Sequence, residues 1–246
     1  MKVARFSTGG DPRFGILDGD ELVVLAGDPM FSGFDTIDER VPLSAARLLA
    51  PVIPRSKVVG VVPSDDPDGE PTIFLKPNTS VVGPDDAIQI PEGAGTVEAN
   101  GVLVIVIGSV AKRVKAEDYK QVVFGYTAGN DVTAVDLAAA DGQWARAKGY
   151  DTFAPIGPFM ETELDPSIVV VETDIDGGGS RTVSIEGLGF QVPQIVELVS
   201  EIWTLLPGDL IMVALPGEGL EIVDGSQVSV SIDGVGVLEN IARSRA

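Results

Sequence analysis

The chain has 246 residues, of which 44% are hydrophobic and 22% are charged, a composition that predicts a folded globular protein and excludes a largely disordered one. Acidic residues outnumber basic residues by 37 to 17, so the formal net charge of -20 disfavours nucleic acid and anionic membrane surfaces as partners. The sequence has no cysteine and no histidine, which excludes disulfides, thiol catalysis and acid–base chemistry by histidine.

The first 54 residues predict a small β-rich domain. Apolar and polar residues alternate over 2–27 around Gly and Asp turns, which is typical of short antiparallel strands. A short helix is expected within Pro42–Pro54, with Ser44 as its N-cap. The N-terminus lacks the apolar segment of a signal peptide, and no apolar run is long enough to span a bilayer, so we expect a cytoplasmic protein.

Residues 55–246 predict a larger domain made mainly of strands. Runs such as 102–108, 167–177 and 227–240 are rich in β-branched residues and end at Gly, Pro or Asp. Helical patterns are confined to 115–129, 134–149 and 191–208. Many strands with few helices predict an α+β, β-rich fold, a mixed β-sandwich or β-roll, and not a doubly wound α/β sheet.

Five sequence blocks in this domain carry a specific resemblance. They are Phe74–Pro84, Val104–Val114, Gly125–Ala134, Trp144–Pro158 and Leu205–Ile211. Their order and spacing strongly resemble the fumarylacetoacetate hydrolase family, and residues 1–54 resemble the small N-terminal domain of its bacterial members. The resemblance implies the family's β-roll fold and a homodimer.

The resemblance also implies a site for a hard divalent cation, held by two glutamates on one strand and by an aspartate. Such a cation needs several anionic oxygens before it can polarise a carbonyl and stabilise an enolate. Only Asp131 matches this pattern, because the two glutamate positions hold Asn100 and Val102. We therefore predict no metal and no cofactor. A register shifted by two residues would instead bring Glu98 to the site from the same strand face.

Lys148 and Asp131 are the predicted catalytic residues, because the resemblance places both in the pocket. In the functional interpretation, the two residues position a substrate carbonyl or enol. Lys148 then donates a proton and Asp131 accepts one. In the alternative interpretation they are an ion pair left behind after loss of the cation, with the ammonium offsetting the desolvation of the carboxylate. The predicted substrate-binding residues are Lys76, Tyr126, Asn100, Val102, Val135, Ala138, Val213 and Leu215.

Several of these positions hold apolar residues where the family has charged or hydrogen-bonding groups. This pattern favours a hydrophobic small molecule as the partner, since each buried CH2 contributes roughly 0.8 kcal/mol on leaving water. The competing explanation is that the apolar side chains fill the vacated site and stabilise the fold.

Three functional hypotheses follow. The first is a metal-independent cyclase, isomerase or lyase that orients a hydrophobic, polyketide-like secondary metabolite. The second is an inactive family member that serves as a structural or regulatory partner. The third is a residual metal-dependent carbon–carbon hydrolase or decarboxylase. An open pocket on the order of several hundred Å³ would favour the first hypothesis, and a filled one the second.

Overall fold

The computed structural model describes residues 1–64, 69–186, 188–215 and 217–244. Its largest sheet has the strand order β4-β3-β2-β1-β14-β12-β11-β17-β6-β7, with β5 paired to β1 and β8 paired to β14. The strands of this sheet are β1 (Lys2–Ser7), β2 (Arg13–Asp18), β3 (Glu21–Leu25), β4 (Thr36–Pro42), β5 (Arg47–Leu48), β6 (Val58–Val62), β7 (Thr72–Lys76), β8 (Val81–Val82), β11 (Gly101–Ile107), β12 (Val123–Asn130), β14 (Ala154–Glu161) and β17 (Leu210–Val213).

Two smaller sheets complete the β structure of the described residues. One has the order β13-β10-β18, and the other the order β16-β15-β19-β20-β9. Their strands are β9 (Ala87–Ile90), β10 (Val97–Ala99), β13 (Thr133–Ala134), β15 (Val170–Ile175), β16 (Gly179–Ser184), β18 (Leu220–Glu221), β19 (Gln227–Ile232) and β20 (Gly236–Ser244). The α-helices are α1 (Pro29–Ser32), α2 (Val135–Asp141), α3 (Ala145–Lys148) and α4 (Val192–Ile202), and 3₁₀ turns cover Leu43–Ala45, Asn78–Ser80, Ala116–Gln121 and Pro166–Ile168.

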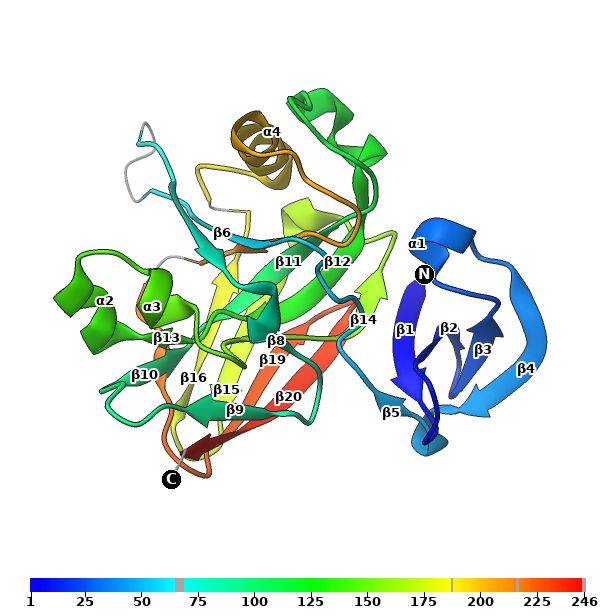
Figure 1. Ribbon diagram of the computed structural model, residues 1–246, viewed down its shortest axis with the longest axis horizontal. Helices are drawn as coiled ribbons and strands as arrows, with labels where there is room; N and C mark the ends of the chain where they lie inside the picture. The colour runs from blue at the N-terminus through cyan, green and yellow to red at the C-terminus, as the bar shows by residue number, and fades with distance from the viewer. Residues whose placement is uncertain (65–68, 187, 216, 245–246) are drawn as a thin grey trace.

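The N-terminal strands β1 to β4 form a small lobe beside the main body (Figure 1). The lobe joins the body through an antiparallel pairing of β1 with β14, in which Lys2 faces Glu161 and Val3 faces Met160. The predominance of strands confirms the β-rich class predicted from the sequence. None of the helices in the described ranges has the length and apolar character of a membrane span.

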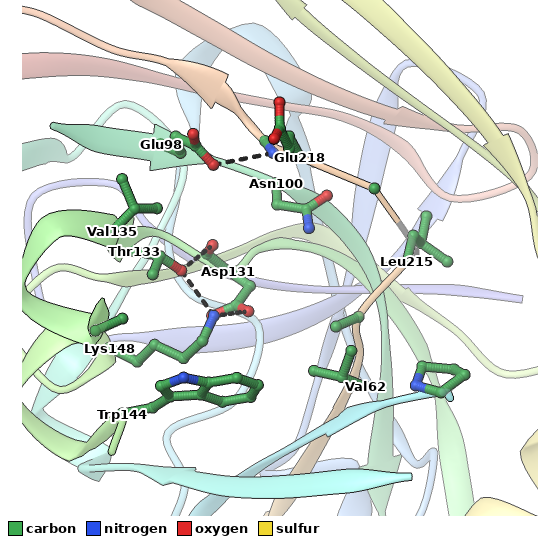
Figure 2. Close-up of a pocket in the computed structure, with 15 residues that line it drawn as sticks. Val62, Glu98, Asn100, Asp131, Thr133, Val135, Trp144, Lys148, Leu215 and Glu218 are labelled. Atoms are coloured by element: carbon green, nitrogen blue, oxygen red, sulfur yellow. Dashed lines mark hydrogen bonds and ion pairs between the residues drawn. The ribbon is translucent and has the colours of Figure 1, made fainter. Parts of the chain in front are cut away.

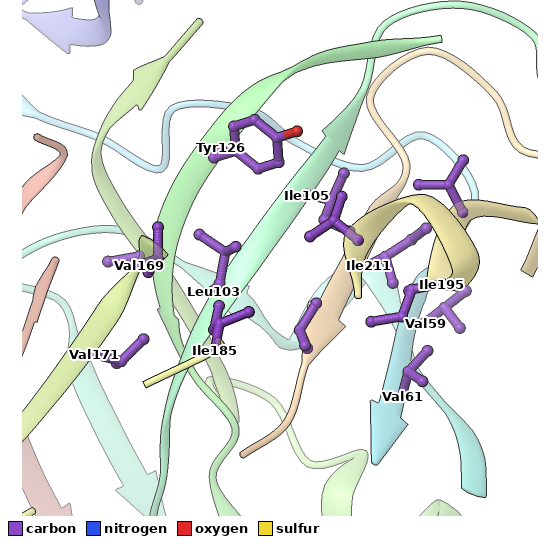
Figure 3. Packing of buried hydrophobic residues seen from close by; sticks show 14 of the residues in the cluster. Val59, Val61, Leu103, Ile105, Tyr126, Val169, Val171, Ile185, Ile195 and Ile211 are labelled. Carbon is purple, nitrogen blue, oxygen red and sulfur yellow. The ribbon is translucent and has the colours of Figure 1, made fainter. Parts of the chain in front are cut away.

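Strand β11 is the centre of the core, and every one of its residues is buried. Its odd-numbered residues Leu103, Ile105 and Ile107 pack in the cluster that includes Ile195 of α4 (Figure 3). Its even-numbered residues Val102, Val104 and Val106 pack in a second cluster on the opposite face. Because side chains alternate along a strand, a strand buried on both faces has a continuous apolar sequence.

Two predicted helical segments are largely extended in the structure. The segment around Ser44 forms only a 3₁₀ turn, because the chain then pairs with β1 and places Leu48 opposite Phe6. The segment 115–129 is a 3₁₀ turn followed by β12, whose backbone bonds to β11 and β14. Tertiary strand pairing thus overrides the local helical spacing in both places.

Helix α4 forms within the predicted segment 191–208 but ends at Ile202, and its buried residues are Val192, Ile195, Val196, Val199 and Ser200. Ile202 lies at the last position of the helix and is 47% exposed.

Candidate active site

A pocket of about 320 Å³ lies where β10 meets β11, next to the segment that connects β12 to α3. Figure 2 shows Glu98 and Asn100 on one wall, Trp144 and Lys148 on another, and Asp131 between them. The lining residues are Val62, Pro63, Glu98, Asn100, Asp131, Thr133, Val135, Ala138, Trp144, Lys148, Ala214, Leu215, Gly217, Glu218 and Gly219. This volume is within the range of small-molecule sites.

Asp131 follows the last residue of β12 and is almost completely buried. Its Oδ2 atom lies 2.6 Å from Nζ of Lys148, and its Oδ1 atom lies 2.8 Å from Nζ of Lys76. Lys148 is the last residue of α3, and its ammonium also donates to Oγ1 of Thr133 at 2.7 Å. The structure therefore brings together one carboxylate and two ammonium groups, which form a cluster with a net charge of +1.

Lys76 is the buried support of this cluster. Its ammonium donates to the carbonyl oxygens of Val132, Lys148 and Phe153, each at 2.9 Å. These carbonyls belong to the segments that carry Asp131 and Lys148, so Lys76 fixes the backbone on both sides of the pair. A buried ammonium is tolerated only when its donors are satisfied in this way.

The electrostatics of the cluster follow from burial and from the close opposite charges. Burial lowers the pKa of Lys76 to about 8, although the charge of Asp131 opposes this effect. Burial by itself would raise the pKa of Asp131, but the charges of Lys76 and Lys148 outweigh burial and hold the pKa below its ordinary value. Asp131 is therefore a stable carboxylate at neutral pH.

The residues at this place do not fit a divalent cation. Both oxygens of Asp131 face ammonium groups, and the amide oxygen of Asn100 accepts a hydrogen bond from Arg181 at 2.6 Å. Val102 has no oxygen in its side chain, and Oε2 of Glu98 accepts a hydrogen bond from the backbone of Gly219. No group of three or more acidic side chains in the described part of the chain is arranged to hold a metal. A cation here would have ammonium neighbours where it needs carboxylates.

The structure brings most of the predicted site residues to one pocket. Its lining includes Asn100, Asp131, Val135, Ala138, Lys148 and Leu215. Lys76 does not line the pocket but contacts Asp131 from behind.

Three predicted site residues, Val102, Tyr126 and Val213, lie in the core and do not line the pocket. The chain passes from the small sheet of β10 into the large sheet of β11 at Asn100. The side chain of Glu98 therefore lines the pocket, whereas the side chain of Val102, four positions later, is buried in the core. Tyr126 packs with Ile105 and Val169 away from the pocket (Figure 3), and burial together with its contact to Tyr119 raises the pKa of its phenol.

Four polar or aromatic lining residues were not among the predicted site residues: Glu98, Thr133, Trp144 and Glu218. From the sequence, Glu98 is expected only as a metal ligand in a shifted strand register. The signal for it is its spacing of two from Asn100, because residues i and i+2 of a strand share a face. Trp144 lies within the predicted helical segment 134–149, but α2 ends at Asp141 and α3 begins at Ala145, so Trp144 is in the turn between them. Glu218 lies in a loop before β18, where the sequence predicts no strand or helix pattern.

The family model for the fumarylacetoacetate (FAA) hydrolase C-terminal domain matches residues 54–242. The chain belongs to this family. A second model, Rv2993c-like N-terminal, matches residues 1–51. The family assignment confirms the resemblance and the family's β-rich fold.

The similar proteins cover between 80% and 100% of the chain. The protein Rv2993c of Mycobacterium tuberculosis is 38% identical, with 98% of this chain and 97% of that protein covered. A solved structure named 2-hydroxyhepta-2,4-diene-1,7-dioate isomerase, from Mycobacterium marinum, is 37% identical with a TM-score of 0.94 and covers 100% of this chain and 99% of that chain. The mitochondrial oxaloacetate tautomerase Fahd2a of Rattus norvegicus is 30% identical over 80% of this chain and 74% of that protein.

Proposed function

We propose that the protein is a metal-independent isomerase that moves a proton next to a carbonyl group. The ammonium of Lys148 donates a hydrogen bond to the carbonyl oxygen and stabilises the enolate that forms when the adjacent carbon loses a proton. The carboxylate of Glu98 accepts this proton and returns it to another position of the same enolate. Substrate and product then contain the same atoms, and the reaction needs no oxidant, reductant or second substrate.

The single observation that carries the proposal is the position of Lys148. An ammonium has three N–H donors, and two of them bond to Asp131 and Thr133. The third has no hydrogen-bond acceptor among the described residues, and the side chain is 10% exposed at the pocket wall. Because Lys76 and Lys148 share one carboxylate, the excess positive charge suits an oxyanion.

Glu98 supports the role of the base. It lies on β10, lines the pocket and is half-buried. Its Oε2 atom accepts a hydrogen bond from the backbone N–H of Gly219 at 3.0 Å, and Oε1 has no partner in the described part of the chain. One oxygen therefore orients the carboxylate while the other is available for proton transfer.

The mixed lining supports a substrate class. Next to the charged groups, the wall contains the apolar side chains of Val62, Val135 and Leu215. An enolisable carbonyl compound with an apolar remainder has both features, and polyketide-like compounds are one such class. The relatives named isomerase and tautomerase support the reaction type. The cavity of about 320 Å³ favours this proposal over a filled, inactive pocket.

A ketonisation assay tests the proposal. The enol of pentane-2,4-dione, dissolved in dry ethanol, is diluted into buffer at pH 7 with excess EDTA, and the loss of enol absorbance is recorded with and without protein. We expect acceleration that is insensitive to EDTA, and a loss of about 10²- to 10³-fold in Lys148→Met, which removes the oxyanion donor. Equal rates with and without wild-type protein would contradict the proposal, as would an unchanged rate in the variant.

A further inference from the structure

Asn100 lines the pocket at the point where the chain passes from β10 to β11. Three of its polar groups have partners within the fold. Its backbone N–H donates to Oδ1 of Asn130 at 2.9 Å, and its carbonyl oxygen accepts from the backbone N–H of Asp131 at 2.8 Å. Its side-chain oxygen accepts from Nη1 of Arg181 at 2.6 Å. The side-chain NH2 group is left, and it has no acceptor within residues 1–64, 69–186, 188–215 and 217–244.

Arg181 determines which end of the Asn100 amide faces the pocket. A guanidinium has only N–H donors, so the atom of the amide that meets it must be the oxygen. The nitrogen is then on the other side of the amide, and Figure 2 shows it pointing from the wall into the pocket. An amide without this partner could also turn its oxygen to the pocket, where it would repel an oxyanion.

Arg181 reaches Asn100 from a neighbouring sheet. It lies on β16 directly opposite Thr173 of β15, and directly opposed side chains lie on the same face of a sheet. Oγ1 of Thr173 accepts a hydrogen bond from the backbone N–H of Gly101 at 3.0 Å. A Cβ atom at Gly101 would lie 2.2 Å from this oxygen, so the missing side chain allows the close approach. The half-buried side chain of Arg181 is therefore held beside Asn100.

We propose that Asn100 is a second hydrogen-bond donor to the enolate, and that Arg181 is the positioning residue that keeps its NH2 group turned into the pocket. This inference rests on the proposed function and adds a second donor to it. Asn100 and Lys148 lie on different walls of the cavity (Figure 2), so an enolate between them would meet a donor from each. Donors that are already fixed stabilise developing negative charge without reorganisation. The position where the family resemblance implies an acidic metal ligand thus holds a neutral donor.

Binding of 4-nitrophenolate tests the donor without turnover. This anion carries negative charge on an oxygen, and its absorbance reports the hydrogen bonds that the oxygen accepts. In a titration at pH 8 with EDTA, we expect Asn100→Ala to bind it about tenfold or more weakly than the wild type, because a hydrogen bond to a charged acceptor is lost. Equal affinity of wild type and variant would overturn the donor, as would a wild type that does not bind the anion.

An isosteric variant keeps this test independent of side-chain size. Asn100→Asp retains the shape and the acceptor for Arg181 but has no N–H donor, so it should also weaken phenolate binding. The matched control is Asn78→Asp, which makes the same change at an exposed residue outside the pocket and should bind like the wild type. Similar losses in both variants would show that the added charge, and not the missing donor, weakens binding.

A double-variant cycle tests whether Arg181 acts through Asn100. Arg181→Met should weaken phenolate binding about threefold or more, because the amide is then free to turn. In the Asn100→Ala background the same change should cost much less, since only the loss of the guanidinium charge remains. Arg181→Lys can still donate to the amide oxygen and should retain part of the affinity. Equal losses from Arg181→Met in both backgrounds would overturn the positioning role.

The binding and ketonisation assays separate this inference from the proposed function. Asn100→Ala should also slow ketonisation about tenfold or more. Weaker phenolate binding by Asn100→Ala, without any ketonisation by the wild type, would support the oxyanion donor and overturn the isomerase. Ketonisation by the wild type, with unchanged rate and unchanged phenolate affinity in Asn100→Ala, would overturn the donor and leave the isomerase intact.

Discussion

Lys148 places its ammonium 2.6 Å from the Oδ2 atom of Asp131, although the two residues are 17 positions apart in the chain. The contact forms because β12 ends at Asn130 and α3 ends at Lys148, so two element termini meet at the pocket. Lys76 closes the arrangement from the buried side. The same carboxylate therefore offsets two positive charges, one that is structural and one that faces the pocket.

Asp131→Asn is expected to destabilise the fold by about 3–5 kcal/mol, because it leaves the buried ammonium of Lys76 without its counter-charge. Urea unfolding measures the free energy of unfolding. The double variant Asp131→Asn with Lys76→Met removes both buried charges and should recover part of this loss. A single variant within about 0.5 kcal/mol of the wild type would contradict the role of the ion pair.

Glu98→Gln is expected to slow ketonisation by about 10²- to 10⁴-fold, because the amide cannot accept the proton. The control is Glu221→Gln. Glu221 pairs with Glu98 across β10 and β18 but is exposed and does not line the pocket. The two variants lose the same charge on neighbouring strands, so equal rates in both would show that Glu98 is not the base.

Lys76 is expected to contribute to the pH dependence of the free energy of unfolding. Its pKa is about 8 in the folded protein, below the ordinary lysine value of 10.5 that applies in the unfolded chain. Between these values the unfolded chain binds more protons than the folded one, so the contribution of Lys76 to stability rises with pH over this window. The difference in unfolding free energy between the wild type and Lys76→Met should therefore increase from pH 8 to pH 10.5. A flat difference would show that the ammonium is not desolvated.

Asp131 predicts a dependence of the same sign in acid, because its contribution to stability also rises with pH. Its folded pKa lies below the ordinary value of 3.8, so its stabilising contribution is complete above that value and disappears as the pH falls through the lower folded pKa. Asp131→Asn should remove this part of the acid dependence. The measurement is the difference in unfolding free energy between wild type and variant from pH 5 downward.

Gly60→Ala is expected to destabilise the protein by about 1–3 kcal/mol, because the new Cβ would lie 1.9 Å from the ring of Phe74. Gly10→Ala is the control, since a Cβ at Gly10 has no neighbour within 4 Å. Thermal unfolding measures the effect, and equal stability of the two variants would contradict the close packing of Phe74 on Gly60.

The sequence by itself determined the β-rich fold and the family, and the resemblance to that family placed Asp131 and Lys148 in one pocket. Strand runs, turn residues and ordered motifs are local features, so they can be recognised without coordinates. The absence of the ligand set for a divalent cation was also visible, because Asn100 and Val102 stand at positions where the family has glutamates.

Only the tertiary structure decided which apolar residues face the pocket. Because side chains alternate along a strand, the sequence can assign Val102 and Val213 to one face of their strands. Both faces of β11 and its neighbours are buried, so this pattern cannot distinguish residues of a cavity wall from residues of the core. Glu98 reaches the pocket, and Val102 does not, because the chain changes sheets at Asn100. The burial of Lys76 behind Asp131 depends on backbone carbonyls that lie 56 to 77 positions away in the chain, and such long-range contacts leave no local pattern in the sequence.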